Sequence, residues 1–246
     1  MTPTPVLAHE IVERPGAADR LLVLLHGYGE PASDLRDRLA LIDPDGRYLA
    51  VVPEAPFERK GRAIWHRALS VPEVAGEQYR ASTAALDALL GALQAETGLA
   101  ATDAVVGGFS QGGGLALGLL LGADVAHRPR AGFGVCSFPP PVRGLRVDRR
   151  AASGRPYLLS SAREDHFAPI EASRSGAVLL RETGLDLAYV EADGAHEMTD
   201  EAAEQIGAWL AAVDGGQRWT GDRAADLLAG VSARSGLYDD LWEHVS

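Results

Sequence analysis

The sequence predicts an α/β fold in which a mostly parallel sheet is covered by helices on both faces. Short, continuous apolar runs recur along the chain, such as Leu-Leu-Val-Leu-Leu at 21–25, and longer segments with helical spacing separate them. A strand that is apolar at every position is buried on both faces, as in a parallel sheet between helix layers. The alternation of strands and helices favours the same architecture.

The elements expected in the first quarter of the chain follow this alternation. Leu7–Val12 is expected to be an edge strand and Arg20–Leu25 a fully buried one. Ala32–Leu41 is predicted to be a helix, because a serine and an aspartate near its start can cap it. Tyr48–Val52 is a second buried strand, ended by a proline.

The middle of the chain contains the longest expected helix. Pro56–Gly76 is expected to be irregular, and Glu77–Thr97 has an apolar stripe at helical spacing with a glycine directly after it. Ala104–Val106 is then a short strand, and Leu115–Leu121 is expected to be helical.

The remaining elements repeat the strand and helix pattern. Three further strands are expected at Ala131–Cys136, Pro156–Ser161 and Leu185–Glu191. Two further helices are expected at Pro169–Thr183 and Glu197–Val213. The loop Ser137–Arg155 is rich in proline and arginine, which makes it a candidate for the rim of a binding site.

The chain therefore divides into a predicted α/β domain at 1–213 and a C-terminal helical extension at 214–246. The extension has an apolar stripe at helical spacing, formed by Leu237, Tyr238, Leu241, Trp242 and Val245. Such a stripe must be buried. The sequence leaves two docking modes open for it, on its own domain or on a second copy in a homodimer.

Composition excludes several classes of protein. The formal net charge of −11 argues against a nucleic-acid partner, which requires a basic surface, and makes anionic membranes unattractive. The single cysteine, Cys136, is expected to be a buried strand thiol and cannot form an intrachain disulfide. Neither a signal peptide nor a membrane span is evident, so the expected location is the cytoplasm.

The most informative segment is Val-Val-Gly-Gly-Phe-Ser-Gln-Gly-Gly-Gly at 105–114. It reads as a strand, a Gly-x-Ser-x-Gly turn and a helix. A sharp turn of this kind holds a serine hydroxyl in the open above the sheet edge, and the flanking glycines remove Cβ atoms that would clash. The pattern predicts that Ser110 is a nucleophile. Glycine is common in this chain, at 28 of 246 residues, so the context of the motif carries the prediction.

A serine nucleophile requires a base and a carboxylate that orients it. His196 follows the last predicted strand in a loop and is the candidate base. Asp165 follows the strand before it and is the candidate acid, with Glu164 and Asp193 as rivals. Asp193 is only three residues from the histidine, and the third group normally comes from another strand. The chain order serine, acid, histidine is also the order that this type of sheet imposes.

The developing oxyanion needs two convergent N–H donors. One is the backbone N–H of Gln111, directly after the nucleophile. The other is expected from the glycine-rich loop at 26–29, where Tyr28 is the candidate donor and His26 is expected to shape the loop. Trp65 and Phe167 are candidates for lining an acyl pocket. No metal-ligand motif or phosphate-binding glycine loop is present in the sequence, so neither a metal nor a cofactor is expected.

These segments resemble the phospholipase/carboxylesterase family of α/β-hydrolases, which includes bacterial carboxylesterases and acyl-protein thioesterases. The resemblance covers residues 21–213, and its most specific part is Gly-Phe-Ser-Gln-Gly-Gly at 108–113. It implies the α/β-hydrolase fold, a triad of Ser110, Asp165 and His196, and oxyanion donors at Tyr28 and Gln111. The implied activity is hydrolysis of a small acyl ester or thioester without a cofactor.

Two alternatives remain at this stage. An amidase or peptidase would use the same triad, and its mark would be turnover of an anilide alongside a matched ester. A non-catalytic binding protein on a hydrolase fold would not react with a covalent serine reagent.

Overall fold

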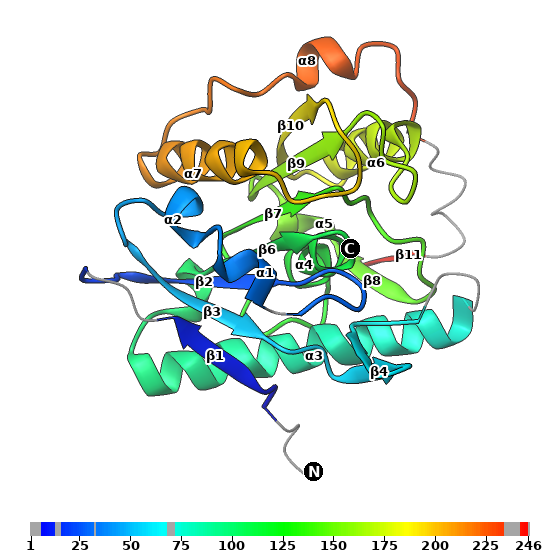
Figure 1. The fold of residues 1–246 in the computed structure, drawn as a ribbon. Coiled ribbons are helices and arrows are strands. Elements are labelled where there is room, and N and C mark those ends of the chain that lie inside the picture. Colours follow the sequence, from blue (N-terminus) through cyan, green and yellow to red (C-terminus); the bar gives the residue numbers. More distant parts are fainter. Residues whose placement is uncertain (1–5, 13–15, 32, 68–71, 234–241, 246) are drawn as a thin grey trace.

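A computed structural model describes all residues except 1–5, 13–15, 32, 68–71, 234–241 and 246. Its central sheet contains the buried strands that the sequence predicts. Its strands are β1 (His9–Val12), β2 (Arg20–Leu25), β3 (Tyr48–Pro53), β6 (Val105–Phe109), β7 (Ala131–Val135), β9 (Pro156–Ala162) and β10 (Asp186–Ala192). They lie in the order β1-β3-β2-β6-β7-β9-β10 (Figure 1). Only β1 pairs antiparallel, with β3, at one edge of this sheet.

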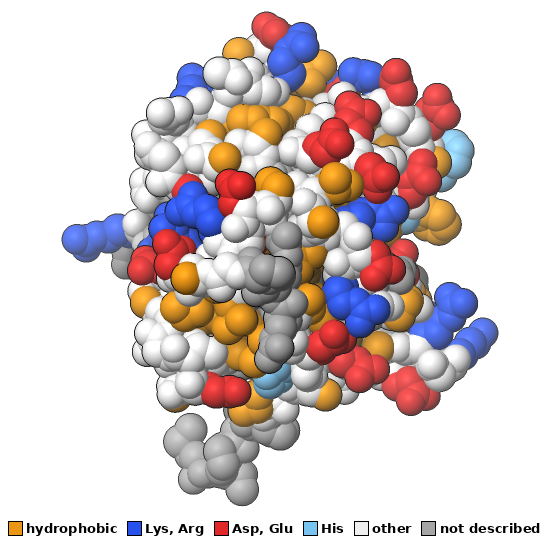
Figure 2. Space-filling model, turned by 60° about the vertical axis from the view of Figure 1, so that its left-hand side comes forward, with side chains coloured by type: hydrophobic (Ala, Val, Ile, Leu, Met, Phe, Trp, Pro, Cys, Tyr) orange, Lys and Arg blue, Asp and Glu red, His pale blue; other side chains and the backbone are white. Residues whose placement is uncertain are grey.

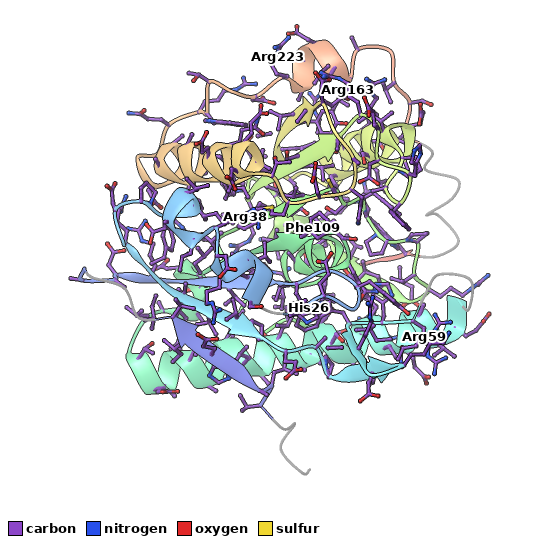
Figure 3. All side chains as sticks on the ribbon, in the orientation of Figure 1. His26, Arg38, Arg59, Phe109, Arg163 and Arg223 are labelled. Atoms are coloured by element: carbon purple, nitrogen blue, oxygen red, sulfur yellow. The ribbon has the colours of Figure 1, made fainter. Side chains whose placement is uncertain are left out.

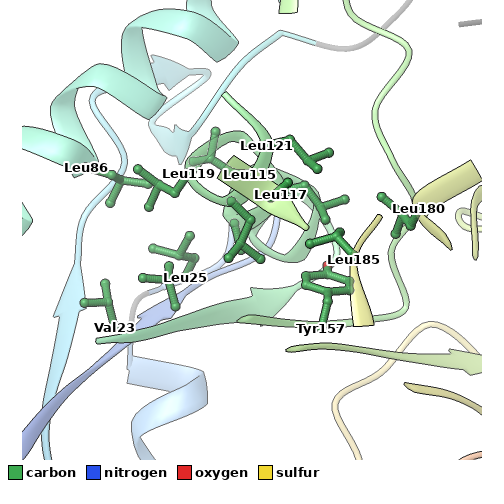
Figure 4. Packing of buried hydrophobic residues seen from close by; sticks show 14 of the residues in the cluster. Val23, Leu25, Leu86, Leu115, Leu117, Leu119, Leu121, Tyr157, Leu180 and Leu185 are labelled. Atoms are coloured by element: carbon green, nitrogen blue, oxygen red, sulfur yellow. The ribbon is translucent and has the colours of Figure 1, made fainter. Parts of the chain in front are cut away.

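The two faces of the sheet bury separate apolar cores, and β2 contributes to both. Leu21, Val23 and Leu25 belong to one core, and Leu22 and Leu24 belong to the other. Side chains alternate between the faces of a strand, so a continuous apolar run serves both. Figure 4 shows the first core, where Val23 and Leu25 approach leucines from two helices.

Helices cover both faces. The first core is covered by α3 (Pro72–Thr97), α4 (Gln111–Leu121) and α6 (Ile170–Glu182). The second core is covered by α1 (Ser33–Arg36), α2 (Leu39–Ile42) and α7 (Asp200–Asp214). Since β2, β6, β7, β9 and β10 run parallel, the loops after them emerge at the same edge, which is where an open α/β sheet binds its ligands.

Several segments differ from the sequence prediction. The helix expected at Ala32–Leu41 is two short helices, α1 and α2. The segment expected to be irregular at 56–76 contains a hairpin of β4 (Phe57–Arg59) and β5 (Arg62–Ile64), and the start of α3. The loop expected at 137–155 contains β8 (Leu145–Asp148) and α5 (Arg149–Ala152). A short 3₁₀ turn at Ala101–Asp103 precedes β6.

The C-terminal extension is helical only in part. It contains α8 (Ala224–Leu227) and ends in β11 (Trp242–Val245), a strand that pairs in parallel with β8. The helical prediction is therefore wrong for Trp242 and Val245, because pairing with a strand distant in the sequence determines their conformation. Leu237, Tyr238 and Leu241 lie outside the described residues. Trp242 is buried in the first core, so this end of the extension docks on its own domain.

The extension also contacts the outer strand of the sheet. The Arg223 N–H donates to the Tyr189 carbonyl in β10 at 2.9 Å, and the Tyr189 N–H donates to Asp222 Oδ1 at 3.0 Å. Burial opposes ionisation of Asp222, but the N–H groups of Tyr189 and Ala224, together with the Arg218 guanidinium, outweigh it and lower its pKa. Both main-chain groups of Tyr189 that face away from β9 are thereby satisfied.

Ion pairs fix the C-terminal end of α7. The Asp214 carboxylate is buried and is contacted by Arg20, Arg47 and Arg130, and it accepts a hydrogen bond from the Tyr48 hydroxyl at 2.9 Å. On the face in Figure 2, the basic side chains are scattered among acidic ones rather than forming a continuous patch.

Candidate active site

The turn between β6 and α4 holds Ser110 in a backbone conformation that few non-glycine residues adopt. Its φ is 51° and its ψ is −117°, and its N–H donates to the Val135 carbonyl in the neighbouring strand at 2.8 Å. Such strain persists only where surrounding structure enforces it, and it concentrates at functional sites. The turn presents the serine above the carboxyl edge of the sheet, as the motif predicts.

Two glycines allow this turn to form. A Cβ atom on either Gly108 or Gly112 would overlap the carbonyl oxygen of Leu25, the last residue of β2. The turn therefore packs directly against the end of the adjacent strand. The glycines two residues before and two residues after Ser110 are required by this close approach.

His196 lies in the loop between β10 and α7 and faces the serine. Its Nε2 is 2.9 Å from Ser110 Oγ. The rings of Phe109 and Phe167 flank the imidazole, with centroid distances of 4.8 Å and 5.1 Å. These contacts restrict the orientation of the ring.

Asp165 completes a hydrogen-bonded chain. Its Oδ2 is 2.6 Å from His196 Nδ1, and its Oδ1 accepts the backbone N–H groups of Phe167 and Ala168, both at 2.8 Å. The carboxylate is buried. Because Nδ1 faces an acceptor, it carries the proton, which leaves the Nε2 lone pair to accept from the Ser110 hydroxyl.

The two rival acids lie outside this chain of hydrogen bonds. Glu164 is exposed, and Asp193 is exposed and forms an ion pair with Arg163 at 2.6 Å. Arg163 thus joins the acid loop to the histidine loop, and its backbone N–H also donates to the Ala192 carbonyl at 3.0 Å. Figure 3 labels Arg163 in the upper part of the view, above Phe109.

A buried carboxylate supports the same pair of loops. Glu191 accepts two hydrogen bonds from the Arg174 guanidinium, at 2.7 and 2.8 Å, and one from the Tyr189 hydroxyl at 3.0 Å. Burial alone would raise the pKa of Glu191, but these hydrogen bonds outweigh it, so the pKa lies below its usual value. The end of β10 is thereby fixed just before the histidine loop.

The loop after β2 is held from both sides. His26 Nδ1 donates to the Gly27 carbonyl at 2.7 Å, and its Nε2 accepts from the Ala55 N–H at 3.2 Å. His26 is buried, which agrees with the loop-shaping role expected for it, and it lies near Phe109 at the centre of Figure 3. Within the described part of the chain, the N–H groups of Tyr28 and Gln111 donate to no protein acceptor.

The Gln111 side chain holds the backbone of the segment at 65–66, a role that the sequence did not reveal. Its Oε1 accepts the Trp65 N–H at 2.9 Å, and its Nε2 donates to the His66 carbonyl at 2.9 Å. Trp65 is fully buried, and its indole N–H donates to the His26 carbonyl at 2.9 Å. Trp65 therefore supports the loop after β2 from the protein interior. The expectation that Trp65 lines the acyl pocket is wrong, because its side chain does not reach the cavity.

A cavity of about 170 Å³ opens beside Ser110. It is lined by Tyr28, His66, Ser110, Gln111, Gly114, Cys136, Ser137, Phe138, Pro140, Phe167, Ala168 and His196. Phe167 is 79% exposed and lies at the border of this cavity. The sequence did not single out His66 or Phe138 as lining residues, although the proline-rich loop that carries Phe138 was predicted to be a rim.

A larger hollow of about 650 Å³ lies elsewhere, against the first residues of β9 and β10, Pro156 and Asp186. These are the amino ends of the strands, whereas the side chains around Ser110 come from the carboxyl ends. The smaller cavity is therefore the one that adjoins the hydrogen-bonded chain.

One group of potential metal ligands occurs in the described residues, and it overlaps this site. Donor atoms of Cys136, Asp165 and His196 lie within 4.8 Å of one another. Both ring nitrogens of the histidine already face hydrogen-bond partners. Burial, and secondarily the Asp165 charge, raise the pKa of the Cys136 thiol to about 12, so it stays protonated. These three side chains are therefore arranged as hydrogen-bond partners, with the free lone pair of the histidine directed at Ser110.

None of the helices in the described part of the chain is both long enough and apolar enough to cross a membrane.

The chain is similar to several known proteins. A family described as Phospholipase/Carboxylesterase matches residues 7–212. The putative hydrolase MhqD of Bacillus subtilis strain 168 is 27% identical over 216 residues, which cover 79% of this chain and 94% of that protein.

Solved structures extend the likeness. The Bacillus cereus carboxylesterase superposes with a TM-score of 0.72 at 19% identity, covering 82% of this chain and 92% of that one. Esterase PE8 gives 0.69 at 26% identity, covering 84% and 99%. Acyl-protein thioesterase 2 of Zea mays gives 0.66 at 19% identity, covering 83% and 98%. The predicted α/β-hydrolase fold is confirmed.

Proposed function

Since this chain belongs to the phospholipase/carboxylesterase family, we propose that it is a serine hydrolase that cleaves carboxylic esters or thioesters through an acyl-enzyme. The observation that carries the proposal is the continuous hydrogen-bonded chain from Asp165 through His196 to Ser110. These three side chains come from three separate loops. A serine, histidine and aspartate in this geometry form the constellation that activates a hydroxyl nucleophile.

In the proposed mechanism, Ser110 Oγ attacks the acyl carbonyl while its proton moves to His196 Nε2. The N–H groups of Tyr28 and Gln111 stabilise the oxyanion of the tetrahedral intermediate. The intermediate collapses as His196 returns the proton to the leaving oxygen or sulfur. Water, deprotonated by the same histidine, then attacks the acyl-enzyme and releases the acid. Asp165 holds the imidazole in the tautomer that can accept a proton.

The cavity supports a small acyl substrate. Its volume of about 170 Å³ is below the range of typical drug-sized ligand sites. We expect hydrolysis of p-nitrophenyl esters with short to medium acyl chains and of a matched thioester. The corresponding anilide, whose nitrogen must be protonated as it leaves, should be slower by at least about 10², or ~2.7 kcal/mol in barrier. Equal kcat/KM for ester and anilide would favour an amidase.

The test of the nucleophile is covalent labelling by a fluorophosphonate. Ser110→Ala should abolish labelling and lower esterase turnover by about 10³ or more. Ser153→Ala is the matched control, because Ser153 is exposed on the turn before β9. Labelling that persists in Ser110→Ala identifies another nucleophile. A wild-type protein that is neither labelled nor active on any ester is a binding protein on a hydrolase fold.

A further inference from the structure

His66 places one fixed polar group in the wall of an otherwise largely apolar cavity. It lies in the segment between β5 and α3, its side chain is buried, and it lines the cavity beside Ser110. Neither the proposed nucleophile chemistry nor the oxyanion contacts use it.

The orientation of the His66 ring is determined by its contacts. Nδ1 is 2.7 Å from the Arg67 carbonyl oxygen, and a carbonyl can only accept, so Nδ1 carries the proton. The ring packs edge-on against Tyr79 at a centroid distance of 5.8 Å. The backbone is fixed as well, because the Gln111 side chain donates to the His66 carbonyl. The imidazole is therefore a preorganised group.

The remaining nitrogen, Nε2, is a hydrogen-bond acceptor that no described side chain or backbone group uses. Protein atoms do not fully enclose Nε2, so a molecule in the cavity can reach it. Burial lowers the pKa of His66, so the ring is neutral near pH 7 and Nε2 keeps its lone pair. A buried acceptor of this kind favours a ligand that donates a hydrogen bond.

The position of His66 indicates which part of a substrate it meets. Gln111, which holds the His66 backbone, also carries one of the proposed oxyanion donors. The leaving group takes its proton from His196, which comes from a different loop. We infer from this shared support that His66 meets the part of the substrate on the oxyanion side of Ser110, which is the acyl group that remains after the leaving group departs.

We propose that His66 is a specificity-determining residue that accepts a hydrogen bond from a hydroxyl group on the acyl chain, so that short hydroxyacyl esters or thioesters are preferred over their apolar isosteres. The inference rests on the proposed function. It narrows the substrate from a short acyl group to one with a donor in the cavity.

The experiment compares isosteric ester pairs. Each pair of p-nitrophenyl esters carries either a hydroxyl or a methyl group at the same carbon of a butyryl chain, with the substituent at C2 or C3, where the hydroxyl cannot close a five-membered lactone. Each kcat/KM is divided by the rate constant for hydroxide-catalysed hydrolysis of that ester, which removes differences in intrinsic reactivity. Wild-type protein should favour the hydroxyl member of at least one pair by about tenfold, the scale of one hydrogen bond.

Two variants of His66 and one control locate the effect. His66→Phe keeps an aromatic ring against Tyr79 but has no acceptor, and it should abolish the preference. His66→Gln offers a carbonyl oxygen near the position of Nε2, and it should retain part of the preference. His9→Phe is the control, because His9 makes the same Nδ1 contact with a backbone carbonyl, at 2.8 Å, but lies on β1 outside the cavity. It should leave the preference unchanged.

The outcomes separate this inference from the proposed function. Hydrolysis of the esters without a preference for any hydroxyl member overturns the role of His66 and leaves the hydrolase intact. A preference that survives in His66→Phe does the same. If the phenylalanine variant does not fold, His66→Leu, which also lacks an acceptor, gives that answer. Failure to hydrolyse any ester, with no fluorophosphonate labelling, overturns both.

Discussion

Replacing Asp165 with asparagine tests the proposed triad at the residue for which the sequence left rivals open. The carboxylate makes two kinds of contact, with Oδ2 facing His196 Nδ1 and Oδ1 accepting two backbone N–H groups. An asparagine can keep its carbonyl oxygen toward the two N–H groups. Its NH₂ then faces Nδ1, and because both would be donors, the histidine must move its proton to Nε2. In that tautomer it cannot accept the proton of Ser110.

The expected magnitude follows from these contacts. The wrong tautomer in a serine triad lowers turnover by about 10⁴, which corresponds to ~5.4 kcal/mol in the barrier. The two retained hydrogen bonds change from charged to neutral acceptors, which costs about 1 kcal/mol each. Asp165→Asn should therefore lose about 2 kcal/mol of stability and stay folded while losing nearly all activity.

The assay is kcat/KM on a p-nitrophenyl ester, together with urea unfolding of each variant. Glu164→Gln is the matched control, since that side chain is exposed on the same loop, and it should change kcat/KM by less than about twofold. A folded Asp165→Asn variant that keeps more than about a tenth of wild-type activity refutes the reasoning. So does a loss of 10³ or more, roughly the scale of a triad member, in Asp193→Asn.

Three further perturbations address the surrounding structure. Gly112→Ala drives a Cβ into the Leu25 carbonyl, and the resulting displacement of the turn should cut kcat/KM by about 10²; near-normal activity would show that the turn tolerates the shift. Trp242→Ala removes a buried side chain from the first core and should cost about 3–5 kcal/mol in urea unfolding, whereas an unchanged midpoint would mean that the extension does not contribute to the core. Glu191→Gln should lower stability at pH 7. Because the folded pKa of Glu191 is lowered, its contribution to the free energy of unfolding is present above about pH 4.3 and disappears as the pH falls through the folded pKa. The difference in stability between wild type and variant should therefore shrink in acid. A difference that stays constant in thermal unfolding from pH 7 to 3 would contradict this.

The predicted fold depended on strands whose apolar runs are continuous, and these were the elements found most accurately. In 21–25 every residue enters one of the two cores, so burial alone identifies the strand. The short strands were missed because their partners determine them. Trp242 and Val245 have helical spacing with their neighbours in sequence, yet they pair with β8, about a hundred residues earlier in the chain.

In the candidate site, too, the residues that follow predicted strands were found from the sequence, whereas those on irregular segments were not. Ser110, Asp165 and His196 each follow a predicted strand, and the common direction of those strands brings the three together without further information. The cavity wall comes from irregular segments, where sequence offers no period to interpret. His66 reaches the cavity because Gln111 and Tyr79 hold it there, and neither contact is local in sequence.

The hydrogen bonds between the C-terminal extension and Tyr189 affect whether the edge of this sheet can pair with a strand of another chain. An outer strand with free main-chain groups is a template for pairing with a second molecule. Here Asp222 and Arg223 occupy the two outward-facing main-chain groups of Tyr189, in the middle of β10, so a neighbouring chain that pairs there must first displace the extension. The match to the family ends at residue 212, before these two residues. A protein trimmed to that boundary would keep Ser110, Asp165 and His196 but expose the strand, and it would lose solubility by self-association before it lost its chemistry.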